Sequence, residues 1–312
     1  MNATVTMMFH PTVAVEDLEK ARAWFTGLFQ KPDIRWEDRY DTSRLAATYP
    51  VNYSFFIHVG EVVVDALSPS AHAQGAMKNQ NRYRGVKDGM IVLGWYTDDL
   101  VGLNSHLRQF GIRTFDQHDN EVMAGASPKS SMADDILVAL TDPAEQGYRY
   151  EFFELGERHR EFYSRKGDPR LRPDWTVPQT SNGDPLGIIR SSHHTFLTKD
   201  LDRALKLHRD ALGGRIIREG HNEELNADST YLELAGSVHE FAVPRAGSSL
   251  DSRVTTLKDV YFGISFLVDD LDKAESHISD FGIIPKRLNE SVSISPEDGY
   301  GVQWRFITHT PY

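Results

Sequence analysis

The sequence predicts an α+β protein built from four copies of one βαβββ unit. A strand followed by Asp-Leu and an amphipathic helix occurs four times, and the Asp-Leu pairs begin at Asp17, Asp99, Asp200 and Asp270. Each opening is followed by short β-rich runs that turn residues separate. One such unit leaves a face of its sheet open, so the four units are expected to pair into two domains.

The first unit opens with "FHPTVAVEDLEKARAWFTGLF", Phe9 to Phe29. Asp17 is predicted to cap the helix, because its carboxylate can accept backbone N–H bonds in the first turn. Helical spacing puts four apolar residues on one face: Leu18, Ala21, Phe25 and Leu28. The runs "YSFFIHVG" and "EVVVDALSP" are predicted strands, with a turn at Gly60.

The other three units repeat this plan. Unit two opens at 92–112 with "VLGWYTDDLVGLNSHLRQFGI" and closes with "DILVALTDP" and "YRYEFFEL". Unit three opens at 191–214 with "SSHHTFLTKDLDRALKLHRDALGG" and closes with "STYLELAG" and "SVHEFAVP". Unit four opens at 263–283 with "GISFLVDDLDKAESHISDFGI" and closes with "SVSISP" and "GVQWRFIT".

Two segments without clear periodicity divide the chain. Segment 157–187 is polar and rich in Pro, Gly and Arg, which is typical of a linker. It separates an N-terminal domain, 1–156, holding units one and two, from a C-terminal domain, 188–312, holding units three and four. Segment 68–89 is the predicted crossover between units one and two.

Composition limits the chemistry. The chain has 312 residues and a formal net charge of −11, which argues against nucleic acid or an anionic membrane as the main partner. It has no cysteine, so any metal must be held by His, Asp or Glu. No apolar run reaches the roughly 18 residues that span a bilayer, so we expect a cytoplasmic location. The sequence does not determine the oligomeric state, and it is compatible with a homo-oligomer.

This pattern resembles the vicinal oxygen chelate superfamily, which includes glyoxalase I, bleomycin and fosfomycin resistance proteins and two-domain extradiol ring-cleavage dioxygenases. The resemblance covers nearly the whole chain apart from the linker. It implies two domains, each a cup made from two units. It also implies metal ligands at two places in a unit: on the first strand, seven residues before the Asp of Asp-Leu, and at an acidic position on the last strand.

Carried onto this sequence, the first-strand position holds His10 in unit one and His193 in unit three. Units two and four have Val92 and Gly263 there. The acidic position is matched by Asp65, Glu151 and Glu240 in units one to three, whereas unit four offers only Gln303 or Arg305. Extradiol dioxygenases take their last two ligands from unit four, so the chain departs from their pattern at that point.

The implied ligand set depends on which units pair. Pairing units one and two brings together His10, Asp65 and Glu151, and pairing units three and four brings together His193 and Glu240, with Gln303 as a weak third group. Pairing units two and three would join Glu151, His193 and Glu240. Such a set suits a divalent ion, with Fe(II) favoured and Mn(II), Ni(II) or Zn(II) as alternatives. Glu151 and Glu240 are also the candidate catalytic carboxylates.

Strand alternation separates the neighbouring histidines. His193 is predicted to face the cup and His194 to pack beneath the helix with a hydrogen bond. His58 and His239 lie on the opposite parity from the candidate acids, and we expect them beside the ligands or exposed to solvent. Five large aromatics are expected mainly in the core, or lining a pocket for an aromatic substrate: Trp95, Tyr96, Tyr148, Tyr261 and Trp304.

Three functions are consistent with this reading. The first is a metal-dependent enzyme acting on a small aromatic molecule with two neighbouring oxygens, most similar to an extradiol dioxygenase of aromatic catabolism. The second is a glyoxalase-like isomerase or lyase in which a carboxylate moves a proton next to a carbonyl. The third is a binding or resistance protein whose cups hold a small molecule without metal.

Overall fold

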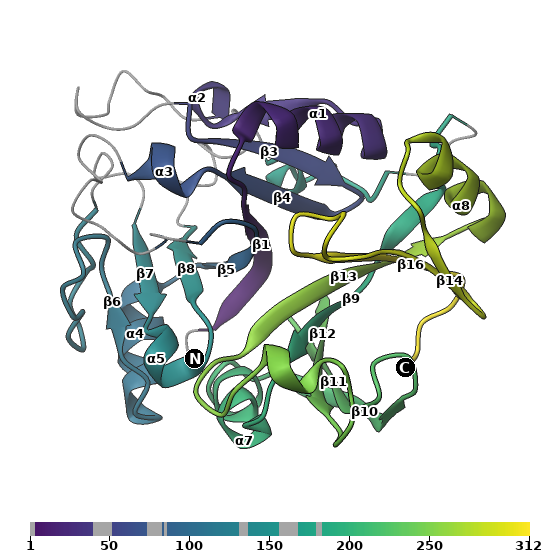
Figure 1. Cartoon of the computed structure of the whole chain (residues 1–312). Helices are drawn as coiled ribbons and strands as arrows, with labels where there is room; N and C mark the ends of the chain where they lie inside the picture. The colour runs from purple at the N-terminus through teal and green to yellow at the C-terminus, as the bar shows by residue number, and fades with distance from the viewer. Residues whose placement is uncertain are drawn as a thin grey trace.

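The computed structural model describes residues 4–39, 52–73, 83, 86–130, 137–155, 168–178 and 183–312. It contains two eight-stranded mixed sheets, with strand orders β2-β3-β4-β1-β5-β8-β7-β6 and β10-β11-β12-β9-β13-β16-β15-β14 (Figure 1). The predicted α+β architecture of four paired βαβββ units is therefore confirmed. None of the helices in these described ranges has the length and apolar character to cross a membrane.

The elements of the first sheet come from units one and two. Unit one comprises β1 (Val5–Ala14), α1 (Leu18–Phe29), β2 (Asp33–Arg35), α2 (Trp36–Arg39), β3 (Ser54–Val59), β4 (Val62–Leu67) and α3 (Pro69–His72). Unit two comprises β5 (Gly89–Thr97), α4 (Leu100–Gln109), β6 (Thr114–Phe115), β7 (Val138–Thr141), α5 (Pro143–Gln146) and β8 (Tyr150–Glu154). In chain order, a short 3-10 helix, η4 (Pro169–Leu171), follows β8 and precedes the strands of the second sheet.

The second sheet comes from units three and four. Unit three comprises β9 (Ile188–Leu197), α7 (Leu201–Leu205), the π-helical turn η5 (Lys206–Ala211), β10 (Arg215–Asn222), β11 (Ala227–Leu234), β12 (Ser237–Pro244) and η6 (Asp251–Arg253). Unit four comprises β13 (Val260–Val268), α8 (Leu271–Asp280), β14 (Lys286–Leu288), β15 (Ser291–Ile294) and β16 (Gln303–Ile307).

Strand pairing decides between the possible cups. The first strands of units one and two, β1 and β5, are antiparallel neighbours, and so are β9 and β13 of units three and four. Within each unit the first strand runs parallel to the last, as β1 does to β4 and β5 to β8. Unit one therefore pairs with unit two and unit three with unit four. The arrangement that would join units two and three is not the one observed.

The four Asp-Leu aspartates cap their helices as predicted. A carboxylate oxygen of each accepts a backbone N–H from the first turn, at 2.7 to 3.1 Å in Asp17, Asp99, Asp200 and Asp270. The third helix departs from the regular α-helix that its spacing predicts, because it continues after Leu205 as a π-helical turn. In that turn Nδ1–H of His208 donates a hydrogen bond of 2.8 Å to the carbonyl oxygen of Ala204. A side chain therefore satisfies one of the helix carbonyl groups.

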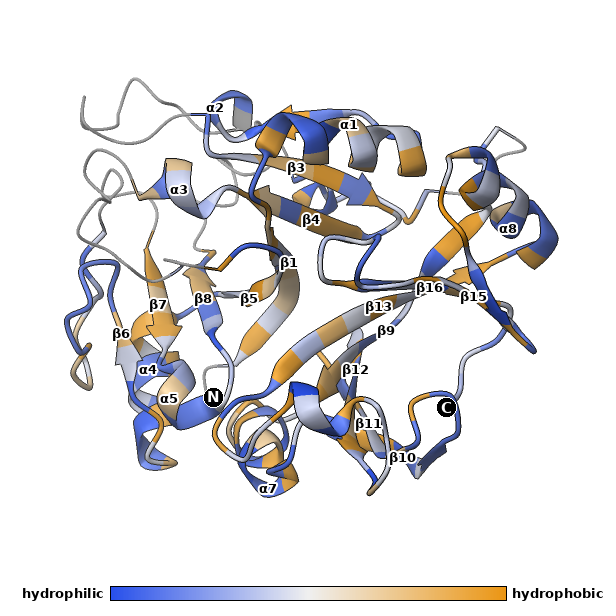
Figure 2. Ribbon diagram, in the orientation of Figure 1, coloured by the Kyte–Doolittle hydropathy of each residue, from blue (hydrophilic) through white to orange (hydrophobic). Residues whose placement is uncertain are grey.

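The two domains share one hydrophobic core. Phe25 and Phe29 of α1 pack against Trp304 of β16, with ring centroids 5.6 and 5.5 Å apart. In the opposite direction, His208 of η5 packs against Trp95 of β5 at 5.7 Å. Figure 2 shows the corresponding pattern, with hydrophobic residues along β3, β4 and β7 and mixed hydropathy along α1. Each domain thus contributes a helix to the packing of the other.

Part of the predicted linker is structural. Asp168 and Arg170 form a buried ion pair of 2.6 Å. The Arg170 guanidinium also donates to the carbonyl oxygens of Met8, Phe9 and Glu61 in unit one. Residues 157–167 and 179–182 of this segment, and 74–82, 84 and 85 of the predicted crossover, lie outside the described residues.

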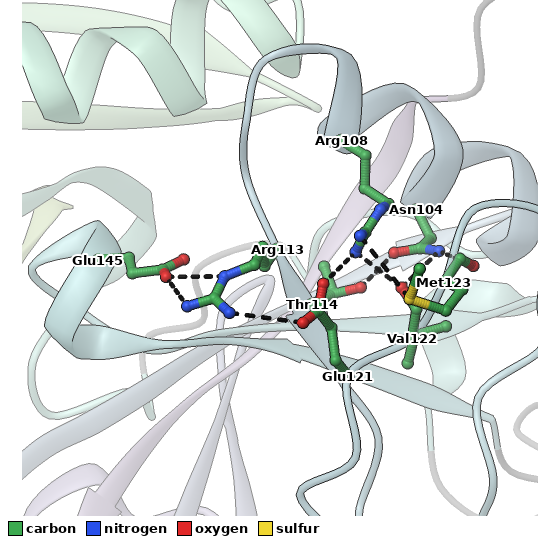
Figure 3. Close-up of polar contacts among 8 residues, drawn as sticks. All are labelled: Asn104, Arg108, Arg113, Thr114, Glu121, Val122, Met123 and Glu145. Carbon is green, nitrogen blue, oxygen red and sulfur yellow. Dashed lines mark hydrogen bonds and ion pairs between the residues drawn. The ribbon is translucent and has the colours of Figure 1, made fainter.

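A polar cluster ties α4 to the outer strands of unit two (Figure 3). Arg108 and Arg113 both pair with Glu121, at 2.7 and 3.4 Å, and Nε of Arg113 donates to Glu145 at 2.8 Å. Asn104 donates to the carbonyl oxygens of Val122 and Met123, and it accepts a hydrogen bond from Thr114. These contacts fix the loop after β6, which carries Gln117 to the edge of the N-terminal cup.

Candidate active site

A cavity of about 80 Å³ lies inside the N-terminal cup and is lined by His10, Asp65 and Glu151. The three side chains come from β1, β4 and β8 and are 5, 6 and 9% exposed. Their convergence follows from the strand register, which sets Asp65 opposite Thr12 on β1 and Glu151 opposite Gly94 on β5. The structure thus brings together the three residues that the sequence assigns to this cup.

The hydroxyl of Thr12 links two of these groups. It donates to Oδ2 of Asp65 at 3.3 Å and lies 3.0 Å from Nδ1 of His10. Since its single proton is directed to the carboxylate, the hydroxyl can only accept from His10, which places the imidazole proton on Nδ1. The lone pair of a neutral His10 is then on Nε2, the tautomer in which Nε2 can bind a metal.

Glu151 comes from unit two, whereas His10 and Asp65 come from unit one. Its Oε1 accepts a hydrogen bond of 3.2 Å from the hydroxyl of Tyr83. Several aromatic side chains complete the lining, among them Trp36, Tyr53 and Phe56. The two carboxylates therefore have different surroundings: Asp65 shares a hydroxyl with His10, whereas Glu151 contacts a phenol.

The three side chains have the donor atoms that a divalent ion needs, but they do not yet converge on one point. In the described parts of the chain, no three His, Asp or Glu side chains lie close enough together to hold an ion as they stand. The donor types do fit, because one imidazole and two carboxylates in one cavity are a common ligand set for Fe(II), Mn(II) or Zn(II). The three candidate residues share a cavity, and binding of an ion would require their side chains to turn toward a common point.

The C-terminal cup holds the other predicted pair in a different state. Nε2 of His193 lies 3.5 Å from Oε2 of Glu240, and both side chains are fully buried. Glu240 accepts hydrogen bonds from Thr195, Asn222, Ser229 and Tyr231, at 2.7 to 2.8 Å. The ring nitrogens of His193 contact the hydroxyls of Ser192 and Ser265 at 2.9 and 3.1 Å. These two groups already have a complete set of protein partners.

The protonation of this pair follows from its burial. Desolvation by burial lowers the pKa of His193 to about 4, so its imidazole is neutral at pH 7. Burial alone would raise the pKa of Glu240, but the His193 ring and the donors Asn222, Ser229 and Thr195 outweigh it and hold that pKa below its ordinary value. Glu240 is thus an ionised carboxylate stabilised by hydrogen bonds.

On the last strand of unit four, a cation, Arg305, stands at the position that is acidic in the other three units. Arg305 forms an ion pair of 2.5 Å with Glu224, and both line a cavity of about 810 Å³ at the cup mouth. The ring of Tyr312 packs 6.4 Å from that of His193, and its hydroxyl donates to the carbonyl of Ser192 at 2.9 Å. The C-terminal segment therefore covers the inner histidine.

Two neighbouring histidine predictions had different outcomes. His194 is buried with its Nδ1 bonded to the hydroxyl of Tyr261, as expected. His239 was expected beside a ligand or exposed, and that prediction is wrong, because the residue is fully buried in the interdomain core beside His194 and His208. Burial lowers the pKa of His194 to about 3, of His208 to about 4 and of His239 well below its usual value.

Sequence reasoning also missed functional candidates. Tyr83 and Gln117 both line the N-terminal cavity, and neither follows the first-strand or last-strand rule of a unit. The motif "NRYRG" carries Tyr83 in an irregular stretch, where no periodic signal predicts orientation. Of the five aromatics expected in the core, Trp95, Tyr96 and Trp304 are fully buried, whereas Tyr148 and Tyr261 also line a groove between the domains.

Comparison with known proteins supports the fold. No family model and no curated protein matches the chain. A 4-hydroxymandelate synthase mutant from Streptomyces coelicolor is similar over 99% of this chain and 94% of that one, with a TM-score of 0.61 and 11% identity. The 2,2',3-trihydroxybiphenyl 1,2-dioxygenase from Sphingomonas wittichii is similar over 97% and 90%, with a TM-score of 0.58 and 11% identity.

A Mn(II)-bound glyoxalase from Novosphingobium aromaticivorans is similar over 97% of this chain and 82% of that one, with a TM-score of 0.55 and 11% identity. These similar structures include dioxygenases and a glyoxalase, so the same arrangement carries more than one reaction. The chain has the fold of the vicinal oxygen chelate superfamily in its two-domain, four-unit form.

Proposed function

We propose that this protein is a divalent-metal-dependent enzyme whose reaction takes place in the N-terminal cup. The observation that supports this is the convergence of His10, Asp65 and Glu151, from three strands, on one buried cavity. In the C-terminal cup the corresponding His193 and Glu240 are satisfied by protein partners, so the proposal gives them a structural role.

The proposed substrate is a small aromatic molecule with two neighbouring oxygens, as in a catechol. The aromatic lining of the cavity, including Trp36, Tyr53 and Phe56, supports a planar apolar body. A bound ion would supply Lewis acidity that lowers the pKa of a coordinated hydroxyl, and Fe(II) in particular would supply reactivity toward O2. The proposed setting is the cytoplasm.

The carboxylates of Asp65 and Glu151 would then have different roles. Asp65 shares the Thr12 hydroxyl with His10, so these two belong to one ligand group. Glu151, the third candidate ligand, would also accept a proton from the substrate, with the Tyr83 hydroxyl orienting it at 3.2 Å. Ring cleavage by O2, as in extradiol dioxygenases, is the favoured reaction.

A glyoxalase-like isomerase or lyase is the second candidate, and the placement of Glu151 is the observation that favours it. A carboxylate that lines the same cavity as His10 and Asp65 is suited to moving a proton next to a carbonyl, and such a reaction needs no O2. Oxygen uptake with catechols under air separates the two reactions, because only ring cleavage consumes O2.

Metal analysis tests the proposal itself. Protein purified anaerobically without a histidine tag is analysed by mass spectrometry as wild type, His10→Ala and His193→Ala. We expect near-stoichiometric divalent metal in the wild type and in His193→Ala, and its loss in His10→Ala. Metal lost only in His193→Ala would move the site to the C-terminal cup. No metal in any sample after reconstitution would leave the third alternative, a metal-free binding protein.

A further inference from the structure

A second cavity lies between the domains and is not part of either cup. This interdomain groove, of about 660 Å³, is formed by the segments around β5 and α5 of the first domain and around η6 and β13 of the second. Its size falls in the range of small-molecule sites, which is roughly 300–1,000 Å³. The walls include the rings of Tyr83, Tyr148 and Tyr261, with Met90 and Leu257 beside them.

Within the part of the chain that the structure describes, the groove contains a cation, Arg149, without a carboxylate partner. Arg149 lies half-buried at its wall, and its guanidinium is stacked over the ring of Tyr83 at 5.7 Å from the centroid. Among the described residues it forms no ion pair. A guanidinium placed over an aromatic ring can still donate its N–H groups to a planar anion.

The other charges of the groove are mostly neutralised or lie at its edge. Arg253 is paired with Glu297 at 2.9 Å. Asp259 is paired with Arg203 at 2.7 Å. The remaining lining charges, Asp88 and Lys258, are exposed and of opposite sign. Arg149 is therefore the charge that an anionic ligand would meet inside the groove.

A second residue of the groove wall has a polar group without a partner. Tyr148 lines the groove, is 6% exposed, and its hydroxyl has no hydrogen-bond partner within the described structure. Burial raises the pKa of Tyr148 well above its usual value, so the hydroxyl keeps its proton and can donate. A buried donor without an acceptor carries a free-energy cost.

Tyr83 connects this groove with the candidate active site. It lines the groove and also the cavity of the N-terminal cup, so a single side chain borders both spaces. On the cup side it donates to Glu151, and on the groove side it carries the Arg149 guanidinium. A ligand in the groove therefore lies next to the proposed reaction space.

We propose that the interdomain groove binds an aromatic carboxylate, with the carboxylate at Arg149 and the ring against Tyr148 and Tyr261. This site is separate from the metal ligands of the N-terminal cup. It rests on the proposed function only in one respect: if that function holds, the groove binds the anionic part of the substrate or a product leaving the cup past Tyr83.

Calorimetric titration with benzoate and with its neutral counterpart benzamide tests the site. The full chain is titrated as wild type, Arg149→Met, Arg149→Lys and Arg245→Met, the last being an exposed arginine outside the groove that gives the same change in net charge. We expect Arg149→Met to weaken benzoate binding about tenfold or more, Arg149→Lys to restore part of it, and Arg245→Met to leave it unchanged. Benzamide affinity should be insensitive to all three.

A His10→Ala variant separates this inference from the proposed function. If benzoate binds in the groove, His10→Ala keeps its affinity even though the cup has lost a ligand. If no metal is found in the protein but benzoate binding still depends on Arg149, the metalloenzyme proposal is wrong and the groove site remains. Benzoate binding that is absent in the wild type, indifferent to Arg149→Met, or lost in His10→Ala would overturn the groove assignment.

Discussion

The hydroxyl of Thr12 lies 3.0 Å from Nδ1 of His10. The same hydroxyl donates to Asp65, so one small side chain sets both the tautomer of a candidate ligand and the position of a second one. The corresponding residue of the C-terminal cup is Thr195, two positions after His193, and it donates to Glu240 at 2.7 Å. In that cup Ser192, and not Thr195, contacts Nδ1 of His193, so the two cups share the bond from threonine to the acid but not the bond to the histidine.

Replacing Thr12 by Val should weaken metal binding without disturbing the shape of the cup. Valine has the same outline but cannot fix the His10 proton, and loss of such an orienting contact typically costs about 10–100-fold in metal affinity. Titration of the apoprotein with Mn(II), followed by electron paramagnetic resonance, measures the change. Thr195→Val is the matched control and should leave the affinity unchanged, whereas an equal loss in both variants would contradict a site confined to the N-terminal cup.

The buried histidines predict a marked acid sensitivity. His193, His194 and His208 have folded pKa values of about 4, 3 and 4, below the value near 6.5 of an unfolded chain. Below pH 6.5 the unfolded state therefore binds more protons than the folded state, so stability is complete above this pH and is lost as the pH falls toward 4. Each histidine contributes up to about 1.4 kcal/mol per pH unit in this window.

Urea unfolding between pH 7 and pH 5 checks this slope. His239→Leu removes a fourth buried imidazole whose pKa is also lowered by burial, so the loss of stability on acidification should become shallower by about one histidine. His221→Leu is the control, because that ring is 33% exposed. Equal slopes for the wild type and His239→Leu would show that this imidazole takes up its proton in the folded state.

The Asp168–Arg170 ion pair should matter for stability although it lies in a linker. Both side chains are almost completely buried, so Asp168→Ala leaves an arginine buried without its counter-charge, at a typical cost of about 3–5 kcal/mol. Chemical unfolding of Asp168→Ala measures this cost. Asp228→Ala removes the partner of the exposed Arg245 and should change the free energy of unfolding by less than about 1 kcal/mol.

Trp304 should stabilise both domains at once. Its ring packs against Phe25 and Phe29 of the other domain, and truncation of a buried large aromatic costs about 3–5 kcal/mol. We expect Trp304→Ala to lower the thermal midpoint while unfolding remains a single transition in calorimetry. Two separate transitions would mean that the domains unfold independently.

The fold could be predicted because its signals are local. Each unit is recognised by an Asp cap, an apolar helix face and alternating strands. The capping role of Asp17 or Asp270 can be predicted from neighbouring residues alone. The meeting of His10 with Glu151 needed one further fact, that β1 pairs with β5, and the sequence offered that pairing as one of several. Once the sheet order is known, the register brings the two residues to the same cavity.

The remaining features depend on contacts between distant residues. Arg170 finds its acceptors at Met8 and Phe9, more than 160 positions earlier, so a polar segment with no periodicity gave no sign of being buried. His239 alternates correctly along its strand, but His208 of η5 and Trp95 of the N-terminal domain cover the face that a lone sheet would expose. Tyr83 acquires its significance from two cavities that exist only in the folded chain.

The exchange of helices between the domains has a mechanical consequence. Because α1 packs on β16 and η5 packs on β5, rotating one domain against the other would pull two aromatic contacts apart at once. A hinge motion that opens the N-terminal cup therefore has a high free-energy cost. A ligand must enter the cup past single side chains that rotate aside. Either half expressed alone would present Phe25, Phe29 or Trp304 to water and would be prone to aggregate.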